Sequence, residues 1–159
     1  YPTEIEFEKK KINIFYLGAA WDDWSNDDNS IYASLQGLTL RPGEELDTGD
    51  LSNASMLDEE FTNINMMLKF FKFGFGRATD FVNEKIRSGN ISRDEAIIIA
   101  EKYDGLCSDE IIKRYTEYVG ITVTEFWDIT NNWVNKDIFN TSPGARPLKK
   151  FTVGVDHES

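Results

Sequence analysis

Apolar residues recur at helical spacing through most of the second half of the chain. From residue 58 onward, apolar side chains three and four positions apart alternate with polar ones, and glycines divide the pattern. This spacing places the apolar side chains on one helix face. Ser92-Arg93-Asp94-Glu95 and Thr122-Val123-Thr124-Glu125 both match the S/T-x-x-E capping box that opens helices. We predict helices from Asp58 to Gly74, about Arg77 to Arg87, Ser92 to near Gly105, Ser108 to Gly120, and Thr122 through Trp133.

The first part of the chain has a different pattern. Residues 12–17, Ile-Asn-Ile-Phe-Tyr-Leu, are β-branched and aromatic and end at Gly18, which predicts a short buried strand. Asn26, Asp27 or Asp28 then caps a short helix. Residues 41–56 hold Pro42, clustered acids and several Ser and Asn, and they predict a loop. We therefore expect a mainly α fold, a bundle of about five short helices with one or two short N-terminal strands.

These patterns divide the chain into three predicted segments. Residues 1–57 carry the strand, the short helix and the acidic loop, and residues 58–139 form a helical domain. Residues 140–159, with Pro143, Gly144 and Pro147, are predicted to be an extended tail. Because residue 1 is Tyr and not Met, we expect the chain to be a piece of a longer protein.

Charge is distributed unevenly over these segments. The 159 residues carry 17 Lys+Arg and 28 Asp+Glu, a net charge of −11, and residues 1–68 alone hold 14 acids and 4 bases. Residues 69–93 instead hold six bases and two acids, a local excess that favours an anion-binding site. The net acidity argues against a general nucleic-acid binder.

Further absences narrow the class of protein. The sequence has one cysteine and one histidine, so we expect no disulfide framework, no metal site and no Ser-His-Asp triad. No apolar run approaches the roughly 18 residues of a membrane span, and no signal peptide is recognisable. We expect a cytoplasmic protein.

The junction between the first two helices of the 58–139 segment is the main candidate site. Gly74 and Gly76 would let backbone N–H groups approach an anion, and the following helix N-terminus adds a favourable dipole. Arg77 can bind phosphate or carboxylate through two hydrogen bonds, and Asp80 can bind a sugar hydroxyl or orient Arg77. The predicted substrate- or phosphate-binding residues are Lys72, Gly74, Gly76, Arg77, Thr79, Asp80, Arg87 and Arg93.

A structural interpretation of the same residues stays open. Gly74 then ends a helix and Arg77 pairs with Asp80. Arg87 would favour its own helix C-terminus, and Arg93 would be solvated. The neighbouring aromatic side chains would belong to the core: Phe71, Phe73 and Phe75.

A second candidate lies after the predicted strand, where α/β proteins often place ligands. Trp21 can stack on a sugar ring, and Asp22 can accept hydrogen bonds from its hydroxyls. The alternative is that one Trp packs in the core and the neighbouring acids cap a helix.

Several short motifs together resemble one family. They are Lys72-Phe73-Gly74-Phe75-Gly76-Arg77-Ala78-Thr79-Asp80, Ile86-Arg87-Ser88-Gly89, Ser92-Arg93-Asp94-Glu95-Ala96, Tyr103-Asp104-Gly105, Phe15-Tyr16-Leu17 with Trp21-Asp22, and Glu125-Phe126-Trp127. The combination resembles the C-terminal part of the N-acetyl sugar amidotransferases, ATP-pyrophosphatase-type enzymes of bacterial lipopolysaccharide and surface-sugar biosynthesis.

The resemblance implies an α/β enzyme that uses ATP and Mg²⁺ to adenylate an acetamido group of a nucleotide sugar. Ammonia from a glutaminase partner then displaces AMP and leaves an amidine. The family's Ser-Gly-Gly-x-Asp-Ser ATP loop does not occur in this chain, so we expect ATP and Mg²⁺ to bind mainly outside it and the fragment alone to be inactive. The competing hypothesis is a non-catalytic helical module that docks a partner protein.

Overall fold

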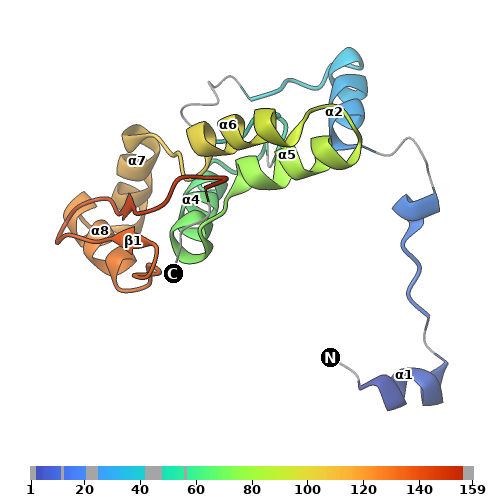
Figure 1. Ribbon diagram of the computed structural model, residues 1–159, viewed down its shortest axis with the longest axis horizontal. Helices are drawn as coiled ribbons and strands as arrows, with labels where there is room; N and C mark the ends of the chain where they lie inside the picture. The colour runs from blue at the N-terminus through green and yellow to red at the C-terminus, as the bar shows by residue number, and fades with distance from the viewer. Residues whose placement is uncertain (1–2, 12, 21–24, 42–47, 56, 156–159) are drawn as a thin grey trace. The chain divides into compact units, whose positions relative to one another are not determined.

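The computed structural model describes residues 3–11, 13–20, 25–41, 48–55 and 57–155 (Figure 1). The chain divides into two compact units, residues 1–39 and 40–159. The described residues are mainly helical, which confirms the predicted fold class, but the strands lie near the C-terminal end and not near the N-terminus.

The N-terminal unit contains α1 (Glu4–Lys10), a 3₁₀ turn η1 (Leu17–Ala20) and α2 (Asn26–Leu35). The strand predicted over 12–17 is wrong for its described part, because residues 13–16 have no regular structure and Leu17 begins η1. Strands need a partner for their backbone groups, and residues 13–16 pair with none of the described residues. The four apolar side chains from Ile14 to Leu17 are 63–80% exposed.

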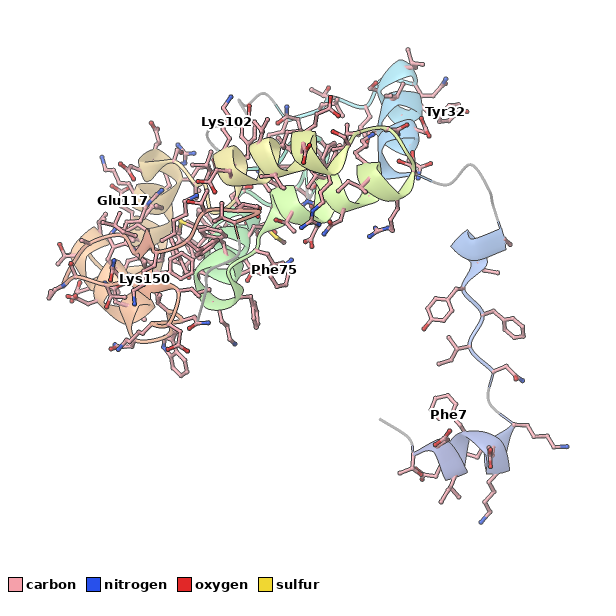
Figure 2. All side chains as sticks on the ribbon, in the orientation of Figure 1. Phe7, Tyr32, Phe75, Lys102, Glu117 and Lys150 are labelled. Atoms are coloured by element: carbon pink, nitrogen blue, oxygen red, sulfur yellow. The ribbon has the colours of Figure 1, made fainter. Side chains whose placement is uncertain are left out.

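The helix predicted after this segment is confirmed. α2 begins at Asn26, and its cap is Ser25, whose Oγ accepts a hydrogen bond from the Asp28 N–H at 3.0 Å. Ser25 takes the role predicted for Asn26, Asp27 or Asp28 because its oxygen accepts the free N–H of the third residue of the helix, Asp28. Tyr32 projects from α2 and is exposed (Figure 2).

The second unit contains the five predicted helices. They are α4 (Thr62–Phe73), α5 (Arg77–Arg87), α6 (Arg93–Tyr103), α7 (Asp109–Val119) and α8 (Val123–Asn131). The capping boxes at Ser92 and Thr122 both form, and Ser108 caps α7. α4 begins four residues later than predicted, after Phe61, without a side-chain cap.

Two hydrophobic clusters hold this unit together. The larger joins α4, α7, α8 and the segment after α8 through the buried side chains Ile64, Met67, Phe70, Phe71, Cys107, Ile111, Ile112, Phe126, Trp127, Val134 and Phe139. The smaller joins α5 and α6, which lie side by side (Figure 1), through Val82, Ala96 and Ala100. The loop before α4 meets the start of α5 at the edge of these clusters, and the candidate site lies there.

A small hairpin closes the unit at its C-terminal end. β1 (Phe139–Asn140) pairs antiparallel with β2 (Leu148–Lys149), with Phe139 opposite Lys149. The Phe139 side chain is 1% exposed and contacts the Phe151 ring at a centroid distance of 5.7 Å. The Val153 N–H donates to Glu101 Oε2 at 2.9 Å, so residues 139–153 lie against the helices.

Candidate functional site

The α4–α5 junction has the backbone geometry that its glycines predict. Gly74 ends α4 with φ +81°, a left-handed conformation that other residues adopt at a cost, and its N–H donates to the Phe70 carbonyl. Gly76 is the N-cap of α5 and provides no side-chain cap. Phe75 lies between them (Figure 2) and is exposed. The free N–H groups of α5 must therefore find acceptors elsewhere.

Asp104 supplies an acceptor for one of these N–H groups, that of Thr79. Its Oδ1 accepts a hydrogen bond from the Thr79 N–H at 3.1 Å, and its Oδ2 accepts one from the Thr79 hydroxyl. A Cβ added at Gly76 would lie 2.9 Å from Asp104 Oδ1, so the missing side chain lets this carboxylate approach the helix end. A carboxylate of the protein thus occupies the kind of position where the sequence predicts a bound anion. Asp104 was not among the predicted site residues.

The acid at position 80 does not pair with Arg77. Asp80 Oδ2 accepts from Lys69 Nζ at 2.6 Å, and Lys69 also lies 4.7 Å from the centre of the Phe75 ring. The Arg77–Asp80 ion pair of the structural interpretation is therefore wrong, and Asp80 pairs with Lys69 instead. Of the three phenylalanines placed in the core by that interpretation, Phe71 is buried, whereas Phe73 and Phe75 are exposed.

Arg77 instead lines a cavity of about 240 Å³ between the loop that precedes α4 and the first turns of α4. It is the first residue of α5, and its Nη2 donates to the Ser55 hydroxyl. Among the described residues, no carboxylate forms an ion pair with its guanidinium. The cavity is lined by Thr48, Asp50, Ser55, Thr62, Asn63, Met66 and Arg77.

Asp50 is the second charged group of this cavity and is 5% exposed. Its Oδ1 accepts from the Ser52 N–H at 3.1 Å and from the Ser52 hydroxyl at 2.8 Å. The Ser55 N–H donates to Oδ2 at 3.3 Å, and the Ser55 hydroxyl lies 3.5 Å from Oδ1. Ser55 therefore contacts both the Asp50 carboxylate and the Arg77 guanidinium.

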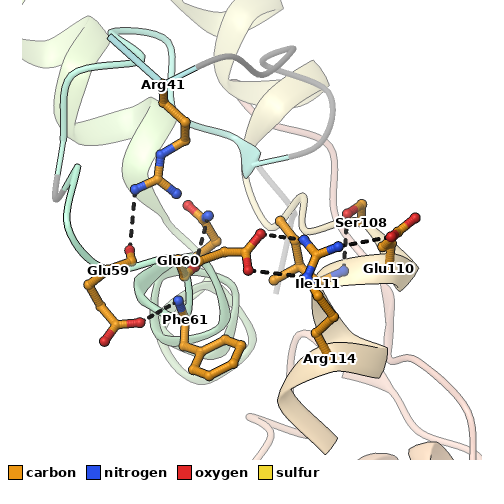
Figure 3. A network of polar contacts seen from close by, with 9 residues as sticks. Arg41, Glu59, Glu60, Phe61, Ser108, Glu110, Ile111 and Arg114 are labelled. Carbon is orange, nitrogen blue, oxygen red and sulfur yellow. Dashed lines mark hydrogen bonds and ion pairs between the residues drawn. The ribbon is translucent and has the colours of Figure 1, made fainter. Parts of the chain in front are cut away.

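A network of polar contacts fixes the loop that carries Asp50 and Ser55. Arg41 Nη2 donates to the carbonyl oxygens of Ser55 and Glu59, each at 3.2 Å. Figure 3 shows the continuation of this network, in which the Arg114 guanidinium of α7 binds Glu60 and Glu110. These contacts raise the pKa of Arg114, and the hydrogen bond to Glu60 is the largest cause. The loop is thus tied to α7 as well as to the start of α4.

The remaining predicted residues do not join Arg77 in one site. Lys72 lies 5.2 Å from the Phe73 ring centre and lines an apolar groove. Arg93 and Thr79 line a third cavity of about 120 Å³, between α5 and α6. Arg87 is exposed in the last turn of α5. Trp21 and Asp22 lie outside the described residues.

The apolar groove has about 320 Å³ of space. It lies between α4, α7 and α8, and Trp133 at its edge is 76% exposed. Its lining residues are Leu68, Phe71, Lys72, Tyr115, Val119, Ile121, Phe126, Ile129, Thr130, Trp133 and Val134. The lining carries one formal charge, that of Lys72, so the groove fits apolar groups and not a phosphate.

Other chemistry has little support in the described part of the chain. Burial raises the pKa of the Cys107 thiol to about 12, which keeps it protonated and unreactive at neutral pH. Within residues 3–155, leaving out the undescribed positions, no three His, Cys, Asp or Glu side chains gather as a metal site would require. In the same part of the chain, no helix is both long enough and apolar enough to cross a membrane.

Comparison with known proteins places the helical unit in a family. No curated protein matches the chain. Residues 55–152 match the family described as LPS biosynthesis protein WbpG-like, C-terminal domain. The matched range includes Ser55 and Arg77 and all five helices from α4 to α8. The chain therefore belongs to the WbpG-like family of lipopolysaccharide biosynthesis proteins and carries its C-terminal domain.

Proposed function

We propose that this chain is the C-terminal helical part of an ATP-dependent amidotransferase that acts on a nucleotide-linked acetamido sugar. The family assignment to lipopolysaccharide biosynthesis supports a surface-sugar substrate. The motifs around Arg77 and Ser92, which resemble the N-acetyl sugar amidotransferases, support the reaction class.

The reaction has two steps. ATP transfers its AMP group to the acetamido oxygen and releases pyrophosphate. Ammonia then attacks the acetamido carbon, the carbon–oxygen bond to AMP breaks, and loss of a proton leaves the amidine. In this proposal a glutaminase subunit supplies the ammonia, and ATP and Mg²⁺ bind mainly to a part of the enzyme outside this chain, because the Ser-Gly-Gly-x-Asp-Ser loop does not occur in it.

The observation that carries the proposed role of this chain is the position of Arg77. Arg77 lines the cavity of about 240 Å³, and its guanidinium has one hydrogen-bond partner among the described residues, the Ser55 hydroxyl. Arginine has five N–H donors, so at least one edge stays available for two parallel hydrogen bonds to an anionic oxygen pair. We assign Arg77 to an anionic oxygen of the sugar substrate.

Calorimetry and turnover of the full-length enzyme test this assignment. Arg77→Ala should weaken binding of the nucleotide sugar by at least about tenfold, since a hydrogen bond to a charged group contributes about 1.5–3 kcal/mol. Ammonium salts serve as the nitrogen source, so that the glutaminase does not limit the rate. Lys113→Ala removes an exposed positive charge from α7 and is the matched control. Unchanged affinity and turnover in Arg77→Ala would refute the role of Arg77.

The apolar groove favours a second candidate function, a non-catalytic module that docks a partner protein. The exposed Trp133 at its edge is the kind of side chain that dominates protein interfaces. Titration of the full-length protein with its glutaminase distinguishes the two functions. If Trp133→Ala abolishes the complex and leaves turnover with ammonium unchanged, the helical unit serves in docking.

A further inference from the structure

Two side chains of opposite charge, Arg77 and Asp50, line the cavity between α4 and the loop that precedes it. Among the described residues, they form no ion pair with each other or with another charged side chain. Arg77 is half-buried, Asp50 is almost fully buried, and both line the same space. Buried charges in proteins are normally paired or fully hydrogen-bonded. Arg77 has unused N–H donors, and Asp50 has unused acceptor sites. Together they fit a ligand that carries both a hydrogen-bond acceptor and a hydrogen-bond donor.

The unused capacity at Asp50 is on Oδ2. Oδ1 accepts both hydrogen bonds from Ser52, whereas Oδ2 accepts one hydrogen bond from the described part of the chain, that of the Ser55 N–H. An ionised carboxylate has about four acceptor sites, so Oδ2 can take a further hydrogen bond from a hydroxyl or amide N–H of a ligand. Ser52 and Ser55 hold the carboxylate in place, so its direction is fixed before a ligand arrives.

The Ser55 hydroxyl couples the two charged groups. It accepts from Arg77 Nη2 and lies 3.5 Å from Asp50 Oδ1. A hydroxyl that accepts from a cation is polarised to donate more strongly to an anion. The positions of the guanidinium and the carboxylate are therefore set by a common neighbour, which fixes the spacing between the two ligand groups that they bind.

The size and lining of the cavity limit the ligand further. The space of about 240 Å³ lies below the roughly 300–1,000 Å³ of cavities for drug-sized ligands, so it fits one ring with a small substituent. Among the described residues that line it, one carries a positive charge and none is aromatic. Protein sites that bind a nucleobase usually stack it on an aromatic ring, and a diphosphate usually takes more than one cation.

We infer that this cavity binds the sugar-phosphate end of the substrate and leaves the nucleoside outside, with an anionic oxygen at Arg77 and a sugar hydroxyl or amide N–H at Asp50. The inference rests on the proposed function for the choice of a sugar. In this inference, Asp50 selects ligands that carry a hydrogen-bond donor next to their anionic group. Ser55 is the positioning residue for the Asp50 carboxylate and the Arg77 guanidinium.

Saturation-transfer NMR on the unsubstituted 159-residue chain is the first test. With a uridine diphosphate N-acetyl sugar as the probe, the sugar-ring protons should receive more saturation than the uracil protons. Stronger saturation of the uracil protons, or none at any proton, would overturn the inference. Because no variant is needed, a folding defect cannot obscure this result.

Four variants of the same chain then separate the two contacts. The probes are N-acetylglucosamine 1-phosphate, N-acetylglucosamine and inorganic phosphate. Arg77→Gln should weaken binding of the sugar phosphate by about tenfold or more and leave that of the neutral sugar unchanged. Asp50→Asn should weaken both sugar ligands and leave inorganic phosphate unchanged. Ser55→Ala should weaken all three probes, whereas Asp137→Asn, which neutralises an exposed acid after α8, should change none.

Each outcome separates this inference from the proposed function. If Asp50→Asn weakens inorganic phosphate as much as the sugar phosphate, Asp50 acts through the loop and its selective role is refuted. If the sugar phosphate binds as expected but the full-length enzyme forms no amidine, the inference stands and the proposed function falls. If turnover depends on Arg77 while the uracil protons receive the saturation, the proposed function stands and this inference falls.

Discussion

The clearest stability prediction concerns the carboxylate that caps α5 from outside the helix. In Asp104→Ala, the Thr79 N–H and hydroxyl lose their common acceptor, and Gly76 offers no side chain to replace it. Loss of an N-terminal cap costs about 0.5–2 kcal/mol, and loss of a hydrogen bond to a charged group about 1.5–3 kcal/mol. Because Asp104 is half-buried and partly screened by solvent, we expect a loss of about 1–2 kcal/mol.

Thermal unfolding followed by circular dichroism measures this loss. For a domain of this size, about 1–2 kcal/mol corresponds to a fall in the midpoint of about 3–10 °C. Asp104→Asn keeps an acceptor oxygen and loses the charge, so its midpoint should lie between those of the wild type and Asp104→Ala. Asp137→Ala is the matched control for an exposed acid.

A double-mutant cycle with Thr79→Val assigns the loss to the contact itself. If Asp104 acts through Thr79, the second substitution should cost much less in Asp104→Ala than in the wild-type chain. Equal midpoints for Asp104→Ala and Asp137→Ala would show that the cap contributes nothing, and the argument from α5 would fail. Additive effects in the cycle would place the contribution of Asp104 elsewhere.

Three further predictions concern other parts of the helical unit. Gly105→Ala should destabilise it by about 2 kcal/mol or more in denaturant titration, because a Cβ there overlaps the Phe70 ring and Gly105 has φ +78°. Burial alone would raise the pKa of Glu101, but hydrogen bonds from Lys149 and the Val153 N–H lower it below the usual carboxyl value. The ionised Glu101 therefore stabilises the hairpin above the usual carboxyl pKa, and this stabilisation is lost as the pH falls through the lowered pKa. Lys149→Met should reduce this loss of stability in acid, measured by unfolding curves from pH 7 to pH 2. Cys107 should react with a thiol reagent only in denaturant, and rapid reaction of the folded chain would contradict its burial.

Local capping rules account for the parts of the fold that could be predicted from the sequence. Ser92 and Thr122 define helix starts because their partners, Glu95 and Glu125, lie three residues away. Hydrogen bonds from the backbone and side chains of Ser92 and Thr122 lower the pKa of each Glu, as expected for this motif. The start of α4 was predicted too early because Asp58 is a residue type that often caps helices, whereas α4 begins at Thr62 and its N-cap, Phe61, forms no side-chain hydrogen bond.

Contacts distant in sequence account for what could not be predicted. Residues 12–17 have strand-like composition, but composition does not show whether a partner strand exists, and their described part pairs with none of the described residues. The cap of α5 comes from Asp104, which lies 25 positions after Thr79. Asp50 and Ser55 precede Arg77 by a loop and a helix, and the only local signal was a series of Ser and Asp residues typical of turns.

The basic segment 69–93 shows why a local excess of charge does not define a binding site. Lys69 is neutralised by Asp80, and Lys72 lies over an aromatic ring beside an apolar groove. The N-terminus of α5, which would attract an anion, already holds the Asp104 carboxylate. Asp104 accepts the Thr79 N–H at this helix end, and the side chain of the first helical residue, Arg77, is directed to another contact. Arg77 makes that contact with Ser55, and the candidate site depends on this one cation and a buried acid, not on the sum of the segment's charges.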